Sequence, residues 1–406
     1  MLTLLLLHAW VLRSSFAFAD FLTPVPDHGN VTKPDLCHKD TVISCNLFLI
    51  DIARLHDSSV DFMGATLDFQ DKPGDNTYTF SAGLGQEASF TVDSDLGVVW
   101  GHAQLADGRD FVIEPNLVNC DRCHVVIEEN EEAFPQDHAE TLPSLANEET
   151  RSDVAALLEK GKTDQTTVVS YTILVYYTPE VRDSVDDLRT FVDQAIATTN
   201  QGYINSKIPL RVKLHCLEET TVPEAYFSKN HDGSYENHML HVFRDYNGGG
   251  NNLRRSADAA VLLMKDIPDM CGWGYVIRDG DYDQKAVSMV RYDCAEGGYT
   301  FGHELGHNLG LNHDKYESSL GSPWTPYSQG YHIPGTKEHT IMAYPHGEQR
   351  MPANVYSNPR LVVSGYRLGK DGEADAAKKM TEVRFAIAAN GDESEACQLP
   401  GIPCST

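Results

Sequence analysis

Two parts of the chain differ in the spacing of their hydrophobic positions. Between residues 20 and 127, short runs of β-branched and aromatic residues alternate with polar ones, and turn sequences such as Asp107-Gly108 separate them. The runs begin near Thr66, Tyr78, Ser89 and Leu96. Short runs of this composition, separated by turn sequences, are typical of β-strands. The pattern therefore predicts a small β-rich domain over residues 20–127.

A different pattern begins at Thr167. The run from 168 to 176 predicts a buried strand, and residues 182–203 carry apolar positions at the spacing of an amphipathic helix. The remaining expected elements are strands at 210–217, 257–264 and 286–292, and a helix at 235–246. Strands that alternate with helices favour an α/β domain. For residues 167–406 we therefore expect a mixed, mainly parallel twisted sheet.

Residues 128–166 separate these two regions. From Glu128 to Glu149 the chain is acidic and poor in apolar residues, which is typical of a solvated linker. Residues 153–160 are expected to form a short helix that Gly161 ends. The linker lacks a strong basic processing sequence, so Arg151 and the Lys160–Lys162 segment are weak candidates for an activation cleavage site.

The N-terminal residues indicate the compartment of the protein, and the net charge limits its partners. Residues 1–19 predict a secretory signal peptide, because an apolar run precedes the small-x-small sequence Ala17-Phe18-Ala19. A membrane anchor is the alternative, but the run is shorter than the roughly 18 residues that span a bilayer. A formal net charge of −27 disfavours nucleic acids and anionic membranes as partners. We therefore expect a secreted, monomeric protein without a membrane anchor.

Nine cysteines agree with an oxidising, extracellular compartment. Cys120 and Cys123 have the C-x-x-C spacing, and in this compartment we interpret them as local disulfides rather than a redox centre.

The candidate chemistry lies in the sequence HELGHNLGLNH of residues 303–313. On a helix, His303 and His307 lie one turn apart on the same face, so both imidazoles can reach one metal ion. Gly310 lets the backbone turn sharply through positive φ and bring His313 round as a third nitrogen ligand. Three neutral imidazoles leave one tetrahedral position for water, as in catalytic zinc sites. Glu304 can then accept a proton from that water and pass it to a leaving amine.

This motif, followed by Thr340-Ile-Met342-Ala-Tyr344, resembles that of the metzincin metallopeptidases. In that clan a methionine lies beneath the metal, and Met342 fills this position. Asp314 follows the third histidine, as in the reprolysins or adamalysins, the ADAM-like branch. The first region also carries ordered landmarks that resemble a reprolysin-type propeptide: Val99-Trp-Gly-His-Ala, Asp107-Gly, Phe111-Val-Ile-Glu-Pro and His124-Val-Val-Ile.

The resemblance implies a secreted zinc-dependent endopeptidase with a single catalytic domain of the α/β metzincin type, made as a latent precursor, with one catalytic Zn²⁺ and protein or peptide substrates. It implies that an edge strand holds peptide antiparallel by β-augmentation, and this strand would comprise Gly272, Trp273, Gly274 and Tyr275. Some reprolysin-type domains also carry structural Ca²⁺, although no calcium loop stands out here. The alternative is a catalytically silent binding protein, which the intact residues 303–313 disfavour.

Two departures from the family pattern leave alternatives open. Reprolysin propeptides place a cysteine thiolate on the zinc from a segment just before the catalytic domain, but residues 134–167 contain no cysteine. Cys120, Cys123 or a carboxylate such as that of Asp153 are the other candidates for this role. Tyr344 lies two residues after Met342. In astacin-like and serralysin-like metzincins, a tyrosine at this distance from the methionine reaches the zinc or the developing oxyanion. The alternative is that Tyr344 packs under the turn.

Overall fold

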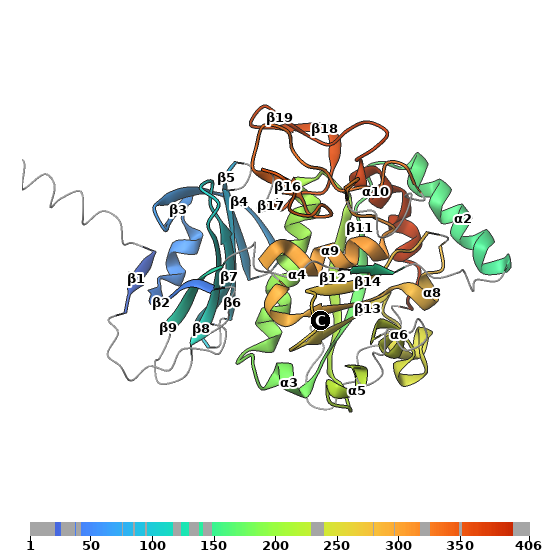
Figure 1. The fold of residues 1–406 in the computed structure, drawn as a ribbon, viewed down its shortest axis with the longest axis horizontal. Coiled ribbons are helices and arrows are strands. Elements are labelled where there is room, and N and C mark those ends of the chain that lie inside the picture. Colours follow the sequence, from blue (N-terminus) through green and yellow to red (C-terminus); the bar gives the residue numbers. More distant parts are fainter. Residues whose placement is uncertain are drawn as a thin grey trace, which may run out of the picture. The chain divides into compact units, whose positions relative to one another are not determined.

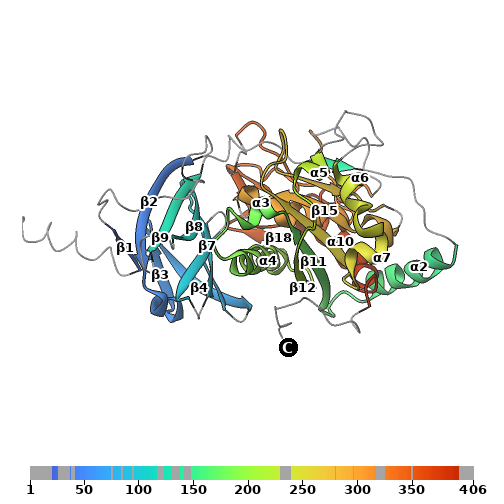
Figure 2. The same cartoon turned by 90° about the horizontal axis from the view of Figure 1, so that it is seen from below.

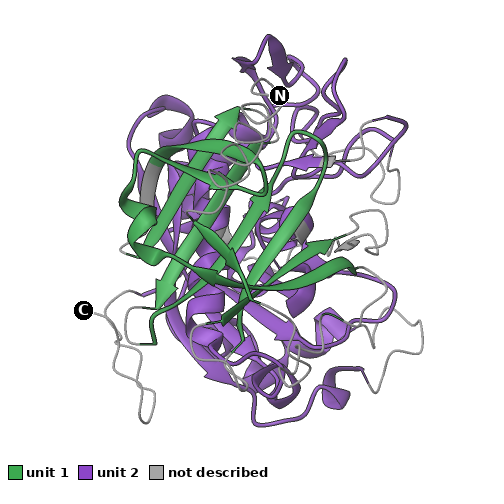
Figure 3. Cartoon of the chain, turned by 90° about the vertical axis from the view of Figure 1, so that its left-hand side faces the viewer, with its two compact units in different colours: residues 1–130 green, residues 131–406 purple. Residues whose placement is uncertain are grey.

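The structure is a computed structural model (Figure 1). It describes residues 21–25, 37, 42–74, 76–83, 86–93, 96–116, 123–129, 138–140, 148–228, 239–278, 280–295, 297–316, 325–348 and 351–392. The chain divides into two compact units, residues 1–130 and residues 131–406 (Figure 3). The predicted signal peptide and Cys120 lie outside the described residues.

The first unit is an antiparallel sheet in the order β1-β2-β9-β8-β7-β6-β5-β4-β3. Its strands are β1 (Leu22–Pro24), β2 (Val42–Ile50), β3 (Ser59–Phe62), β4 (Ala65–Gly74), β5 (Thr77–Gly83), β6 (Gln86–Asp93), β7 (Val98–Gln104), β8 (Asp110–Asn116) and β9 (Cys123–Glu129). The short helix η2 (Ile52–His56) adds Leu55 to a core in which the rings of Phe62, Phe80 and Phe90 meet at steep angles. The strands predicted from the alternating pattern correspond to β4–β7.

Three of the four propeptide-like landmarks lie on the adjacent strands β7, β8 and β9, and Asp107-Gly108 lies in the turn between β7 and β8. The Val99 N–H donates to His124 Nε2 at 2.8 Å, and a Cβ on Gly101 would lie only 2.7 Å from the Phe90 ring. His102 and Asp110 form a buried ion pair of 2.6 Å. Burial lowers the pKa of His102, but the Asp110 carboxylate outweighs it, so that the pKa is raised. These short motifs are therefore explained by the packing of three neighbouring strands.

The second unit contains the mixed, mainly parallel sheet that the sequence predicted. The sheet order is β10-β14-β15-β13-β11-β12, and only the β14–β15 pair is antiparallel. The strands are β10 (His138–Glu140), β11 (Val169–Tyr177), β12 (Leu210–Glu219), β13 (Ala259–Met264), β14 (Gly272–Tyr275) and β15 (Val287–Arg291). Strand β10 comes from the segment that the sequence predicted to be a solvated linker.

Helices cover both faces of this sheet (Figure 2). On one face lie α4 (Leu188–Asn205) and α9 (Thr300–Asn308), and the Tyr171 hydroxyl of β11 hydrogen-bonds the Tyr203 hydroxyl of α4 at 3.0 Å. On the other face, Tyr176 packs against Phe243 among the helices α5 (Ala225–Ser228), α6 (Met239–Arg244) and α7 (Gly250–Arg254). The sequence predicted one helix over residues 182–203. In the structure α3 (Pro179–Arg182) ends at Arg182, and α4 begins only at Leu188, where the Asp187 carboxylate caps it.

Shorter elements complete the second unit. They are η5 (Tyr246–Gly248), α8 (Tyr282–Lys285), η6 (Tyr292–Cys294), η7 (Gly297–Tyr299), β16 (Glu338–Thr340), β17 (Met351–Ala353), β18 (Asn358–Val363), β19 (Tyr366–Leu368) and α10 (Ala376–Ile387). No helix among the described residues is long and apolar enough to cross a membrane. Disulfides join Cys37 to Cys45 and Cys271 to Cys294, and Cys123 and Cys216 are also disulfide-bonded.

The end of the predicted linker forms helix α2 (Glu148–Thr163), which packs on α10. The fully buried Arg384 of α10 donates to the carbonyl oxygens of Asp164, Thr167 and Gly161 at 2.7, 3.0 and 3.4 Å. Gly161 does not end the helix as predicted. A Cβ there would lie 2.0 Å from the Glu382 carbonyl oxygen, so this glycine is required for the close contact of the two helices.

We predict that Arg384→Met lowers the free energy of unfolding of the second unit by about 2–4 kcal/mol, because buried carbonyls lose a charged donor. Urea unfolding followed by tryptophan fluorescence measures this. The control is Lys162→Met on α2, which removes an exposed 3.4 Å ion pair with Glu159 and should cost less than about 1 kcal/mol. Equal losses in both variants would contradict the anchoring role of Arg384.

Candidate metal centre

Helix α9 and the turn after it bring three histidines together. His303 and His307 lie one turn apart on α9, and both are buried. Gly310 has φ +82°, and a Cβ there would lie 2.8 Å from the Ile277 carbonyl oxygen. Only glycine takes this conformation so close to another backbone without strain. The turn therefore returns the chain and directs His313 towards the other two rings.

The Nε2 atoms of the three histidines converge. Those of His303 and His307 are 3.1 Å apart, and those of His307 and His313 are 3.0 Å apart. His303 Nδ1 lies 2.8 Å from the Ile341 carbonyl oxygen, and His307 Nδ1 lies 3.0 Å from that of Leu311. Because a carbonyl only accepts, both Nδ1 atoms carry the hydrogen and both Nε2 atoms carry lone pairs.

Lone pairs that face each other at this distance repel unless a cation lies between them. The ligands of a tetrahedral zinc ion with Zn–N bonds of about 2.0–2.1 Å lie roughly 3.3 Å from one another. Burial lowers the pKa of His303 to about 4 and that of His307 well below its ordinary value, so the rings are neutral at pH 7. The three histidines therefore fit a zinc ion, and they form the one such cluster found among the described residues.

Glu304 lies between α9 and strand β14. Its side chain is fully buried, and a Cβ on Gly272 would lie 2.5 Å from its Oε1, while one on Gly274 would lie 2.7 Å from its Oε2. The two glycines are thus required to make room for this carboxylate. From the sequence we interpreted the Gly-Trp-Gly segment only as a strand that holds substrate. That its two glycines also make room for Glu304 was not predicted.

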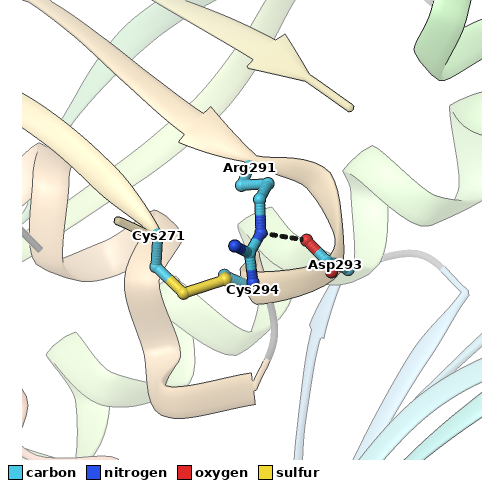
Figure 4. The surroundings of a disulfide bond; sticks show 4 residues. All are labelled: Cys271, Arg291, Asp293 and Cys294. Carbon is cyan, nitrogen blue, oxygen red and sulfur yellow. Dashed lines mark hydrogen bonds and ion pairs between the residues drawn. A yellow bond between two sulfur atoms is a disulfide. The ribbon is translucent and has the colours of Figure 1, made fainter. Parts of the chain in front are cut away.

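The start of β14 is fixed by the disulfide between Cys271 and Cys294 (Figure 4). The Arg291 N–H donates to the Cys271 carbonyl oxygen at 2.7 Å, and the Arg291 guanidinium donates to Asp293 at 2.7 Å. These contacts connect β14, the end of β15 and the segment just before α9. The strand beside Glu304 is therefore held in place by covalent and charged contacts as well as by the sheet.

Met342 and Tyr344 approach the cluster from the turn after β16. The sulfur of the fully buried Met342 would lie 2.6 Å from a Cβ on Gly306, so the methionine packs directly beneath α9. The Tyr344 hydroxyl lies 3.0 Å from His313 Nε2, and its ring lies parallel to that of His303. The phenol is thus within reach of an ion held by the histidines.

Asp314 joins the third histidine to this turn. Its carboxylate accepts hydrogen bonds from the backbone N–H groups of Tyr344 at 2.9 Å and Tyr316 at 2.7 Å, and His332 Nε2 is 3.4 Å away. In the sequence Asp314 served only as a marker of the reprolysin branch. The structure adds a physical role, because this carboxylate fixes the position of Tyr344 relative to His313.

A cavity of about 440 Å³ begins beside Asp314. Tyr316 and His332 line it, and the ring of His346 stacks on Tyr316 with centroids 4.0 Å apart. Lys315 and Lys370 also line it, and both form ion pairs with Glu373. This cavity could not be predicted from the sequence, because its lining residues come from three separate segments, 314–316, 330–335 and 370–373.

The structure also places the other residues that the sequence singled out. The segment Gly272–Tyr275 forms strand β14 beside the cluster, and in the full chain β10 pairs with its outer side. Cys123 is disulfide-bonded and therefore offers no free thiolate to a metal ion, and Asp153 is exposed on α2.

We predict that the full chain binds one zinc ion through these histidines and is stabilised by it. At a free zinc concentration of 1,000 times Kd, the gain in unfolding free energy is about 4 kcal/mol. Thermal unfolding with zinc and with a chelator measures it. His307→Ala should remove the zinc-dependent part, whereas His215→Ala on β12 should keep it. Stabilisation that survives His307→Ala would exclude the proposed ligand set.

Comparisons with known proteins agree with this geometry. Residues 167–355 match a reprolysin-type family model described as Metallo-peptidase family M12. The peptidyl-Asp metalloendopeptidase of Stenotrophomonas maltophilia (strain K279a) is 29% identical over 281 residues, which cover 66% of this chain and 63% of that protein. The peptidyl-Asp metalloendopeptidase of Xanthomonas campestris pv. campestris is 27% identical over 296 residues, covering 70% of this chain and 63% of that protein.

The chain thus spans about 63% of the length of these curated relatives. A solved structure of metalloproteinase-II from Bacteroides fragilis, 12% identical, covers 64% of this chain and 80% of that chain with a TM-score of 0.39. The family match confirms the resemblance inferred from residues 303–313. Over residues 167–355 the chain thus carries a metzincin-type metallopeptidase domain.

Proposed function

We propose that this protein is a secreted zinc-dependent endopeptidase, made as a latent precursor, that cleaves proteins at aspartyl residues. The observation that carries the proposal is the convergence of three buried imidazoles on the helix and turn that also carry the buried Glu304 carboxylate. The name of the relatives, peptidyl-Asp metalloendopeptidase, supports the aspartyl preference. The disulfides and the signal-like N-terminal sequence support secretion.

Each side chain has a distinct role in this proposal. His303, His307 and His313 hold the zinc ion, which when bound would polarise the scissile carbonyl and acidify a water molecule. Glu304 accepts the proton that the attacking water loses and delivers it to the leaving amine. Tyr344 donates a hydrogen bond to the oxygen on which negative charge develops.

The cavity beside Asp314 supports the recognition of acidic side chains. Lys315 and Lys370 share the single carboxylate of Glu373, with the Lys315 ammonium 3.8 Å from it. Asp314 itself is engaged by two backbone N–H groups and by His332. In a chain with a net charge of −27, these two lysines bring ammonium groups to the cavity that can bind a substrate carboxylate.

We predict that Glu304→Ala keeps one bound zinc ion and loses essentially all peptide hydrolysis. The assay uses an unbiased peptide mixture, with and without a zinc chelator, on the full chain and on a form that lacks residues 1–147. Chelator-sensitive cleavage that the variant lacks supports the peptidase. If the variant retains a rate within tenfold of the parent, Glu304 is not the general base. Zinc binding without any cleavage favours the silent binding protein instead.

We also predict that Tyr344→Phe lowers kcat by roughly ten- to a hundredfold with little change in KM, because the hydrogen bond that it loses forms only as charge develops. Zinc content should stay at one ion per chain. The matched control is Tyr366→Phe, since Tyr366 is exposed on β19. Unchanged turnover in Tyr344→Phe would leave this residue with a packing role alone.

A further inference from the structure

His332 lies between the segment that follows the third histidine and the strand β16 that leads to Met342. Its Nε2 is 3.4 Å from Asp314 Oδ2, the same oxygen that accepts the Tyr344 N–H at 2.9 Å. We propose that His332 is a positioning residue, which holds the Tyr344 phenol at the metal centre through the Asp314 carboxylate. This inference rests on the proposed peptidase function and on the role of Tyr344 in it.

The backbone of His332 is fixed beside β16. An isolated β-bridge pairs His332 with His339. Next to it, the Thr340 N–H donates to the Tyr331 carbonyl oxygen and the Tyr331 N–H donates to the Thr340 hydroxyl, both at 2.9 Å. Tyr344 follows Thr340 by only four residues. The side chain of His332 therefore starts from a backbone position that is joined to the turn carrying the phenol.

Two aromatic rings pack around the His332 imidazole. Those of Tyr316 and His346 meet it edge to face, with centroids 5.2 and 5.6 Å away, and only 11% of the His332 side chain is exposed. Both ring nitrogens are buried without a hydrogen bond of full geometry among the described residues. Because an unpaired buried donor costs about 1–3 kcal/mol, the hydrogen belongs on Nε2, where it points at the Asp314 carboxylate.

The Asp314 carboxylate transmits this contact to the backbone. Its Oδ1 accepts the Tyr316 N–H at 2.7 Å, and its Oδ2 accepts the Tyr344 N–H. His332 supplies the second donor on the Oδ2 side. Without the imidazole, Oδ2 would keep the Tyr344 N–H alone on that side, and the carboxylate would hold the backbone at Tyr344 less tightly.

The phenol of Tyr344 is sensitive to small shifts of this backbone. Its oxygen lies 3.0 Å from His313 Nε2, and its ring is parallel to that of His303 with centroids 5.8 Å apart. A group that donates to a developing oxyanion must be held to within about 0.5 Å of its productive position. Because that hydrogen bond forms only as charge develops, a looser Tyr344 lowers kcat and leaves KM nearly unchanged.

The test compares two substitutions of His332 in the full, zinc-loaded chain. His332→Phe keeps an aromatic ring but removes the donor, and should lower kcat by roughly three- to tenfold with little change in KM. His332→Gln places an amide N–H near the position of Nε2 and should recover most of the parent kcat. The control His215→Gln on β12 should leave kcat unchanged. In a Tyr344→Phe background, His332→Phe should have no further effect, because both changes act through the same phenol.

Two further readouts do not depend on hydrolysis. Hydrogen exchange of the Tyr344 N–H in the full chain should become roughly three- to tenfold faster in His332→Phe, while exchange on β11 stays as in the parent. A peptide with a phosphinic group in place of the scissile amide mimics the charged tetrahedral oxygen. It should bind to the zinc-loaded His332→Phe variant roughly three- to tenfold more weakly than to the parent, and this loss should vanish in the Tyr344→Phe background.

Additive effects of the two substitutions on phosphinic-peptide affinity would overturn the positioning role of His332. Unchanged exchange at Tyr344, or an equal acceleration on β11, would overturn it as well, since the effect would then be absent or general. Faster exchange at Tyr344 together with coupled losses of affinity, in a protein that cleaves no peptide, would support the role of His332 and reject the proposed peptidase.

Discussion

The structure of the metal centre depends on where two imidazole protons are held. The carbonyl groups of Ile341 and Leu311 fix the hydrogens on Nδ1 of His303 and His307, and only then do the Nε2 lone pairs converge. Both carbonyls belong to segments that follow α9, so the helix alone cannot make the site. Met342 beneath α9 and the Asp314 link to Tyr344 position those same segments. Without an ion, the converging lone pairs are a source of repulsion at the centre of the domain.

A second constraint is the close approach of backbone to the Glu304 carboxylate. Gly272 and Gly274 leave space for Glu304, and Gly306 leaves space for the Met342 sulfur. Larger residues at these positions would move α9 away from the sheet or from the turn. The helix is therefore held between a strand and a methionine at distances that only glycine permits, and this excludes water from most of the surface of Glu304.

The residues that interact along one helix could be predicted from the sequence. His303 and His307 follow from the helical period, and the position of His313 follows from the turn that Gly310 makes. The mixed sheet also followed from strands and helices that alternate. Strand β10 could not be predicted, because three residues in an acidic segment gain their structure from the edge of β14 rather than from their own pattern. Gly161 was misinterpreted because its conformation is ordinary and its contact with Glu382 lies far away in the sequence.

The disulfide between Cys271 and Cys294 makes the order of the strands beside Glu304 depend on whether the surroundings are oxidising or reducing. It closes a loop with a sequence separation of 23 residues, and such a loop closure contributes roughly 3 kcal/mol. That loop contains β14 and β15, so reduction loosens the two strands beside Glu304 rather than the histidines on α9. Under the proposed function, a reduced chain still holds zinc while the strands beside Glu304 are poorly ordered. Oxidation is then a maturation step that is separate from metal loading.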